Sequence, residues 1–420
     1  MPVRRLPVRP DLDQVKHQAK DLHRAMRAGD PAAIAELREQ HPEPIDPARA
    51  KLADAQHVLA RSYQATSWMR LVQAVQFASA IWRDDLDAVR DLVTANPHLI
   101  REHVLIRTDS NWGPPMTYAA NLGRDRIIRF LHGVGATDME SAAGRAALQG
   151  KVATAEMLYE MAGRPPLDDG ALGGPAYTLS AEGTALLLAL GAPVRRGVGS
   201  PVEVVLQTDA RSPAAKHAIL EMYVRHGLEL PDTPTMALHR GRIDLLEEHL
   251  RRDPALLGRT FSHREIYPAE MGCGDPLDAT VGTPLGGSTL LHMCVDYDEL
   301  EIARWLLDQG MRVDARAAIG PDGFGGHTAL FNTVVSQPNF WMNYRRRGPF
   351  EAPFTELLLA RGASPNIRAS IWKRLHPGHG DTTRHDYRDV TALSWGRRFH
   401  APVFVSQPAM RLIEDAGGEE

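Results

Sequence analysis

The sequence predicts an all-α fold, a repeat solenoid of about nine helix pairs preceded by an N-terminal helical cap. From Thr289 to Gly310, a threonine opens a short apolar helix, a turn follows, and a second helix ends in Leu-Leu-x-x-Gly. The same 21-residue offset links Pro114 to Gly135. Related units return between residues 76 and 418. Each unit is too short to enclose a core, so neighbouring units must bury one another's apolar stripes.

Further copies extend the pattern. Thr328-Ala-Leu-Phe leads to Gly362 and Asn366, and Thr391-Ala-Leu-Ser leads to Gly417. Irregular copies fill residues 141–227, and two units end in Asn-Pro or Asp-Pro, at 85–100 and 243–257. The Thr-Leu-Leu-His opening and the Leu-Leu-x-x-Gly ending resemble the ankyrin repeat, whose period is about 33 residues. The resemblance covers roughly four fifths of the chain and implies a curved stack of antiparallel helix pairs.

The residue types suit these positions. Thr or Ser at the start of a helix accepts a hydrogen bond from a free backbone N–H. Ala119 and Ala120 keep a first helix thin, so that adjacent units approach closely. Gly310 and Gly362 stand where a helix ends in a left-handed conformation, which costs glycine least.

Residues 1–75 form a separate helical leader in this interpretation. Leu12, Val15, Ala19, Leu22 and Met26 follow a helical spacing that starts after Asp11 and stops at Gly29. Asp30-Pro31 then starts a second helix. The pattern from Asp54 to Trp68 resembles the leader that precedes ankyrin arrays in many bacterial proteins. We therefore expect three regions: the leader at 1–75, degenerate repeats at 76–258, and repeats with long insertions at 259–420.

Composition narrows the functional classes. The formal net charge is −4, which does not favour nucleic-acid binding. Two cysteines exclude a disulfide-rich scaffold. Neither a secretory signal nor a membrane-spanning run is visible, so we expect a cytoplasmic protein without a membrane partner.

Four insertions interrupt the period in the C-terminal third: within 259–288, after Gly310, at 336–350 and at 368–389. Insertions in a solenoid form loops on one face, often the binding face. Arginine forks pair with oxyanions and aromatic rings stack on ligands. These insertions supply the candidate residues for partner or anion binding: Trp341, Tyr344, Arg345, Arg346, Arg347, Trp372, Arg374, His376, His379 and His385.

Catalytic and metal signals are weak. The group from His376 to Asp386 has metal-ligand residue types, but its His-x-x-His lies in a Pro-Gly loop, so a solvated loop is favoured and we predict no metal and no cofactor. His292, at the signature position, is expected to tie adjacent units together, and Cys294 to be a buried apolar residue. Cys273, in a loop, is a candidate reactive thiol. No serine-nucleophile motif is present, and the glycines at 323–326 do not form a P-loop.

The resemblance implies a non-enzymatic scaffold or adaptor that binds a protein through its concave face and its C-terminal insertions. The alternative is an enzyme or a small-molecule or anion-binding protein, with a site built from 259–288, 336–350 and 368–389. An enclosed pocket formed by ordered insertions would favour the alternative.

Overall fold

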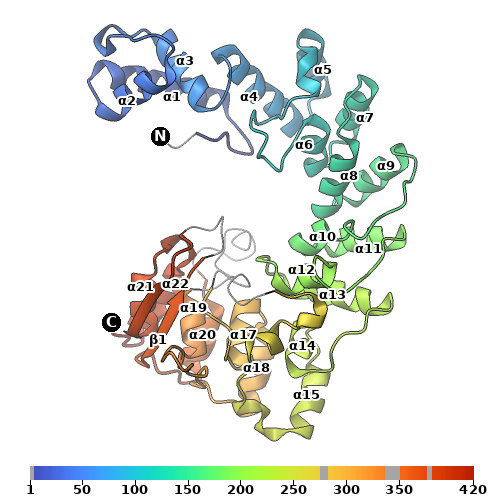
Figure 1. Cartoon of the computed structure of the whole chain (residues 1–420), viewed down its shortest axis with the longest axis vertical. Helices are drawn as coiled ribbons and strands as arrows, with labels where there is room; N and C mark the ends of the chain where they lie inside the picture. The colour runs from blue at the N-terminus through green and yellow to red at the C-terminus, as the bar shows by residue number, and fades with distance from the viewer. Residues whose placement is uncertain (1–3, 275–281, 336–350, 376–380) are drawn as a thin grey trace. The chain divides into compact units, whose positions relative to one another are not determined.

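The computed structural model describes residues 4–274, 282–335, 351–375 and 381–420. The chain divides into two compact units, Met1–Pro165 and Pro166–Glu420. We describe each unit by itself (Figure 1). The predicted limits at 75/76 and 258/259 are divisions of another kind, based on repeat type, and they stay predictions.

Helices joined by loops make up the described residues of the N-terminal unit, 4–165, which include no strand. Its elements are α1 (Leu12–Arg27), α2 (Pro31–Gln40), α3 (Leu52–Ser62), α4 (Trp68–Trp82), α5 (Leu86–Ala95), α6 (Pro115–Leu122), α7 (Asp125–Gly133), α8 (Met139–Leu148) and α9 (Val152–Met161). The first helix has the predicted start, because the Asp11 side chain accepts from the Gln14 N–H at 2.8 Å. It buries Val15, Ala19, Leu22 and Met26, the stripe that its spacing predicted.

The C-terminal unit continues the helical pattern and adds two strands. Its helices are α10 (Gly173–Thr178), α11 (Ala181–Ala189), α12 (Pro201–Gln207), α13 (Pro213–Arg225), α14 (Pro234–His239), α15 (Ile243–Arg252), α16 (His263–Ile266), α17 (Leu290–Tyr297), α18 (Leu300–Asp308), α19 (Ala329–Val334), α20 (Pro353–Ala360), α21 (Ala392–Arg398) and α22 (Gln407–Asp415). The strands are β1 (Ala369–Lys373) and β2 (His385–Val390).

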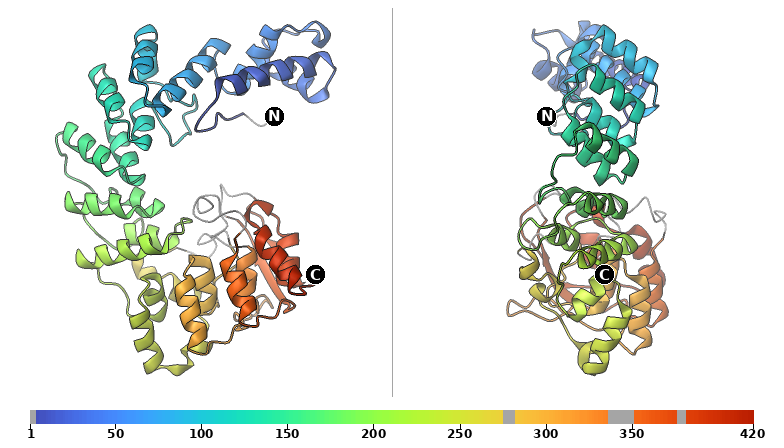
Figure 2. Two further views of the ribbon diagram at one scale, coloured as in Figure 1. Left: turned by 180° about the vertical axis from the view of Figure 1, so that it is seen from behind. Right: turned by 90° about the vertical axis from the view of Figure 1, so that its right-hand side faces the viewer.

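Helices pack as a repeat fold requires. Consecutive helices form pairs, such as α6 with α7, α8 with α9, and α17 with α18. First helices also pack on the first helices of neighbouring pairs, as α6 does on α8 and α17 on α19, and second helices do the same, as α18 does on α20. Figure 2 shows these pairs following one another in chain order within each unit. The predicted mostly helical repeat fold is confirmed.

The first helices of the C-terminal pairs are deeply buried. Every residue of α17 and of α19 is buried. Part of the cover comes from the 259–288 insertion, because the backbone N–H of Thr283 donates to the carbonyl oxygen of Val335 at 2.8 Å. The Trp395 indole N–H donates to the Thr283 hydroxyl at 3.1 Å. The insertion therefore lies against α19 and α21.

The loops between the pairs join side by side into a hydrogen-bonded layer. Phe261 pairs with Ser288, the Ala318 N–H donates to the Gly287 carbonyl at 2.8 Å, and Gly325 pairs with Ser370. We call this set, residues 260–262, 286–288, 316–328, 369–373 and 384–390, the loop layer. Each of these stretches is thereby hydrogen-bonded to its neighbour.

The two strands correct the prediction for 368–389, which expected a loop in an otherwise all-α fold. The β1 and β2 strands are antiparallel, with Ile371 opposite Tyr387 and Lys373 opposite His385. Side chains alternate along a strand, and β1 accordingly buries Ala369, Ile371 and Lys373. The strands lie beside α21 (Figure 1).

Candidate functional site

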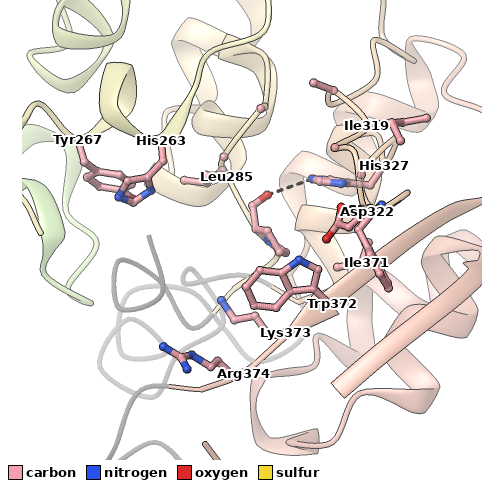
Figure 3. Close-up of a pocket in the computed structure, with 17 residues that line it drawn as sticks. His263, Tyr267, Leu285, Ile319, Asp322, His327, Ile371, Trp372, Lys373 and Arg374 are labelled. Carbon is pink, nitrogen blue, oxygen red and sulfur yellow. Dashed lines mark hydrogen bonds between the residues drawn. The ribbon is translucent and has the colours of Figure 1, made fainter. Parts of the chain in front are cut away.

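A pocket of about 310 Å³ opens among the loops of the C-terminal unit. Parts of three separate stretches form its wall: residues 263–267 and 284–287, residues 318–327, and residues 371–374. In the view of Figure 3, His263 and Tyr267 stand at one side, Ile319, Asp322 and His327 at the other, and the end of β1 below. The loop layer holds these segments together, because all three contribute residues to it. Parts of three predicted insertions thus converge on one cavity.

A glycine permits the close approach of two of these wall segments. Gly325 has a φ of +123°, a conformation that side chains rarely adopt. A Cβ atom at this position would lie 2.0 Å from the carbonyl oxygen of Ala318. Residue 325 must therefore be glycine for the 316–328 hairpin to close and to bond with Ser370.

The walls are mainly apolar or aromatic, with several ionisable groups. Tyr267, Leu285 and Ile371 are buried, and the rings of His263 and Tyr267 lie 4.7 Å apart. The cationic or basic groups are His263, His327, Lys373 and Arg374, and Asp322 is the one carboxylate among the lining residues that the structure describes. Ligand pockets combine an apolar lining with a few convergent polar groups in this way.

Burial changes the protonation of two wall residues. Lys373 is 6% exposed, and burial lowers the pKa of its ammonium group to about 8. Burial also lowers the pKa of His327 to about 4. The His327 Nε2–H donates to the Pro284 carbonyl oxygen at 3.0 Å, so the neutral ring keeps Nδ1 as an acceptor.

Behind Tyr267 lies a buried ionic cluster, which we define as Arg211, Lys216, His239, Asp296 and Tyr297. The hydroxyl oxygens of Tyr267 and Tyr297 are 2.5 Å apart. The Arg211 guanidinium donates to the Asp296 carboxylate at 2.9 Å, with both side chains almost fully buried. One wall of the pocket therefore backs onto paired charges inside the unit.

The other members of the cluster are closely packed as well. The Lys216 Nζ atom lies 2.8 Å from His239 Nδ1 and 3.7 Å from the centre of the Tyr297 ring. Burial lowers the pKa of Lys216 to about 7, and it also lowers the pKa of His239. Burial, the largest single influence, lowers the pKa of Arg211, but the Asp296 carboxylate and the Tyr297 and Tyr267 hydroxyls together outweigh it and raise that pKa.

The structure places three of the candidate residues. Trp372 and Arg374 line the pocket, both from β1 or its end. His385, on β2, does not line it: its Nε2 lies 2.8 Å from the Asp381 carboxylate and its ring stacks on His400 at 4.0 Å. The other candidates, Trp341, Tyr344, Arg345, Arg346, Arg347, His376 and His379, lie outside the described residues.

Other predicted roles can be compared with the structure. His292 bonds the Thr289 hydroxyl through Nδ1 at 2.9 Å and the His327 carbonyl oxygen through Nε2 at 3.1 Å, and so ties two units together as predicted. Cys294 is fully buried, also as predicted. The reactive role considered for Cys273 is wrong, because its thiol is buried and burial raises the pKa to about 12. Within residues 4–274, 282–335, 351–375 and 381–420, no group of three or more His, Cys, Asp or Glu side chains is arranged to hold a metal ion.

Several residues of the site carried no sequence signal that we used. Arg211 and Lys216 sit near the start of α13, and their partners Asp296 and Tyr297 end α17, more than 80 residues away. Tyr267 belongs to an insertion without internal periodicity. The sequence offered one hint: Lys216 is a charged residue among the alanines Ala214, Ala215 and Ala218 near the start of a helix.

The fold and the contacts between its helices are those of a helical repeat protein. One of the repeats matches the model of a known family. The family model for the ankyrin repeat matches residues 286–318, which contain α17 and α18. The chain therefore carries an ankyrin repeat, as predicted.

Two solved structures of ankyrin repeat domains are similar to the chain at low sequence identity. The chain is similar to the human ASB11 ankyrin repeat domain, with 15% identity over 73% of this chain and 99% of that one and a TM-score of 0.28. It is also similar to the ankyrin repeat domain of Bcl-3, a member of the IkappaB family, with 16% identity over 67% and 99% and a TM-score of 0.23. No curated protein matches the chain. None of the described helices has the length and apolar character that crossing a membrane requires.

Proposed function

We propose that the chain is a protein-interaction scaffold that binds its partner through the loop layer of the C-terminal unit. Ankyrin repeats are generally protein–protein interaction modules, and solenoid repeats offer extended binding surfaces. The matched repeat at 286–318 contributes both Gly287 and Ala318 to the layer. Burial of every residue in α17 and α19 supports the loop layer, rather than these first helices, as the surface that contacts the partner.

The observation that carries this proposal is a stack of arginines and aromatic rings on the layer. The Arg384 guanidinium lies 4.7 Å from the Trp372 ring centre and 4.9 Å from that of Phe324. The Arg388 guanidinium lies 4.3 Å from the Phe324 ring centre. Trp and Arg side chains dominate the binding energy of protein interfaces. Backbone hydrogen bonds of the loop layer already hold the segments that carry these side chains. Little ordering entropy of the backbone is therefore lost on binding.

The test compares two stack variants with a matched control. The partner is captured from native lysate with the whole chain, identified, and its Kd measured against Arg384→Ala, Arg388→Ala and Arg312→Ala. Arg312 is an exposed arginine of the same unit outside the layer. We expect each stack variant to weaken binding at least about tenfold, or ~1.4 kcal/mol, and Arg312→Ala to leave it unchanged. Equal affinities for all three variants would contradict the proposal.

Three finer assignments belong to the same proposal. The helix pairs outside 286–318 are degenerate ankyrin units, and residues 1–75 cap the first of them. A cytoplasmic location agrees with two buried, unpaired cysteines, because a reducing compartment keeps thiols free. Deleting residues 1–66, which end before α4 begins, tests the cap: hydrogen exchange in α4 should rise at least about tenfold when the leader is removed.

A further inference from the structure

The pocket in the C-terminal unit has a ligand chemistry of its own, distinct from the arginine–aromatic stack. Arg374 is half-buried on its wall, and its guanidinium has no hydrogen bond or ion pair within the described part of the chain. Guanidinium groups bind carboxylates and phosphates through paired N–H donors. A guanidinium beside a cavity that pairs with no described residue is thus a candidate anion receptor.

The surrounding charges favour an anion as well. The buried Lys373 ammonium shares the wall, and His263 stands on the opposite side (Figure 3). The carboxylate of Asp322 forms an ion pair with the Arg384 guanidinium, which lies 3.9 Å away. Burial lowers the pKa of Lys373 to about 8, and an anion bound beside it would offset that cost of desolvation.

The apolar walls define the rest of the ligand. Tyr267, Leu285 and Ile371 are buried side chains that line the cavity. His327 adds a hydrogen-bond acceptor, because its Nδ1 is buried without a partner in the described residues. A volume of about 310 Å³ lies at the lower end for ligand pockets, which span roughly 300–1,000 Å³. The cavity therefore suits a small molecule with a compact apolar body.

We propose that this pocket binds a small organic oxyanion, a carboxylate or phosphate ester on an aromatic or branched apolar body. Arg374 holds the oxyanion, Lys373 adds positive charge, and the walls formed by Tyr267, Leu285 and Ile371 contact the apolar body. His327 Nδ1 accepts from a hydroxyl or N–H group where the ligand has one. The proposal goes beyond the scaffold function and does not depend on it, because the pocket and the Arg384–Arg388 stack use different arginines.

Four probes separate the parts of this proposal: phenylacetate, phenyl phosphate, the neutral analogue phenylacetamide, and inorganic phosphate. Binding to the whole chain is measured by calorimetry and by thermal shift at up to about 10 mM, which detects affinities weaker than 1 mM. We expect at least one of the two aromatic acids to bind, and to bind at least tenfold more tightly than phenylacetamide. Inorganic phosphate should bind more weakly than either acid that binds, because it lacks an apolar body. The acid that binds identifies the oxyanion class.

Variants then locate the site. Arg374→Gln should weaken the bound acid at least tenfold, Arg374→Lys should restore part of the affinity, and Arg312→Gln should have no effect. Arg374 makes no hydrogen bond or ion pair with a described residue, so Arg374→Gln should keep the wild-type circular dichroism and melting temperature. The proposal is overturned if neither acid binds, if phenylacetamide binds as well as the acids, or if Arg374→Gln binds like the wild type. Because the scaffold test depends on Arg384 and Arg388, either proposal can fail while the other stands.

Discussion

The two compact units differ in how they treat buried charge. In the N-terminal unit, the buried Glu36 is held by Arg4, whose side chain is 38% exposed, and the helices α6 and α8, which pack on each other, bury alanines such as Ala119 and Ala142. In the C-terminal unit, Arg211 and Asp296 are both almost fully buried and face each other inside the fold. The N-terminal unit thus keeps one partner of this ion pair near water, whereas the C-terminal unit buries both partners of an ion pair in its interior.

The difference teaches how insertions change a repeat fold. A bare helix pair leaves its first helix open on one side, where a charge would stay hydrated. Here Thr283 of the 259–288 insertion bonds Val335 at the end of α19 and Trp395 of α21, and Tyr267 of the same insertion bonds Tyr297 of the buried ionic cluster. Covered charges must be paired or neutral, because an unpaired ion in the interior costs several kcal/mol. The C-terminal unit should therefore be far more sensitive than the N-terminal unit to loss of a partner and to pH.

The largest effect is expected from Asp296→Asn. This change leaves the Arg211 guanidinium buried without a carboxylate, which costs about 3–5 kcal/mol of unfolding free energy. Urea titration with hydrogen exchange read at α17 and at α6 measures the two units separately in the whole chain. We expect early exchange at α17 and wild-type exchange at α6.

A double variant sharpens this result. Arg211→Met combined with Asp296→Leu removes both charges and replaces them by apolar groups, so much of the lost stability should return. A single variant that loses less than about 1 kcal/mol would show that water reaches the pair, contrary to its burial.

Acid should also act on the C-terminal unit first. Burial lowers the pKa of His292 to about 3 and that of His327 to about 4, against about 6.5 in the unfolded chain. Below pH 6.5 the unfolded state binds more protons than the folded state, so stability falls as the pH falls toward these values. Each histidine costs about 1.4 kcal/mol per pH unit, or roughly 2 kcal/mol between pH 6.5 and 5.

The check is the free energy of unfolding at pH 7, 6 and 5, read at α17 and at α6. His292→Gln should reduce the pH slope at α17 even if it lowers stability overall. Equal slopes at the two helices would remove the contrast between the units. Lys216 contributes little to the change in unfolding free energy between pH 7 and pH 5, because its lowered pKa of about 7 makes its contribution change mainly above pH 7.

A smaller effect is expected when only a hydroxyl is lost. Tyr297→Phe removes the buried contacts of its hydroxyl with the Leu206 carbonyl oxygen, at 3.1 Å, and with the Tyr267 hydroxyl, at 2.5 Å, and should cost about 1–2 kcal/mol. The ring, and with it the contact to Lys216, remains. Tyr63→Phe in the N-terminal unit is the matched change, since its hydroxyl bonds the Gln18 side chain at 2.9 Å in a partly buried position. It should cost less, and denaturant midpoints at equal m-values compare the two.

The sequence predicted features that depend on local pattern. The stripe of α1, its Asp11 cap and the inter-unit role of His292 all follow from residue spacing and side-chain chemistry. So does the ankyrin repeat at 286–318, whose Thr289 and His292 begin a helix of fixed geometry. Such signals are complete within about 20 residues, the length of one helix pair.

Features that depend on long-range pairing could not be predicted. The strand Ala369–Lys373 is five residues long, and its partner begins only at His385, so neither has the tight turn that announces a hairpin. The burial of Lys373 follows from that pairing, because alternate side chains of β1, Lys373 among them, are buried. Trp372 and Arg374 were chosen for their residue types, but the Tyr267 that stands across the pocket depends on an aperiodic insertion. Insertions have no period, so their paths cannot be read from spacing.

The smallest expected effect tests the exposed side of the comparison. Arg4→Gln removes the paired hydrogen bonds, 3.1 and 3.0 Å long, of a guanidinium on a 38% exposed side chain to the buried Glu36. Solvent screening limits the loss to about 0.5–1 kcal/mol, and added salt should shrink it further. Arg24→Gln, which breaks an ion pair exposed on both sides, is the control and should change stability by less than about 0.5 kcal/mol. Melts of the N-terminal unit at low and high salt make the measurement. If Arg4→Gln cost as much as Asp296→Asn, exposure would not be what separates the two units, and the covering insertion would lose its explanatory role.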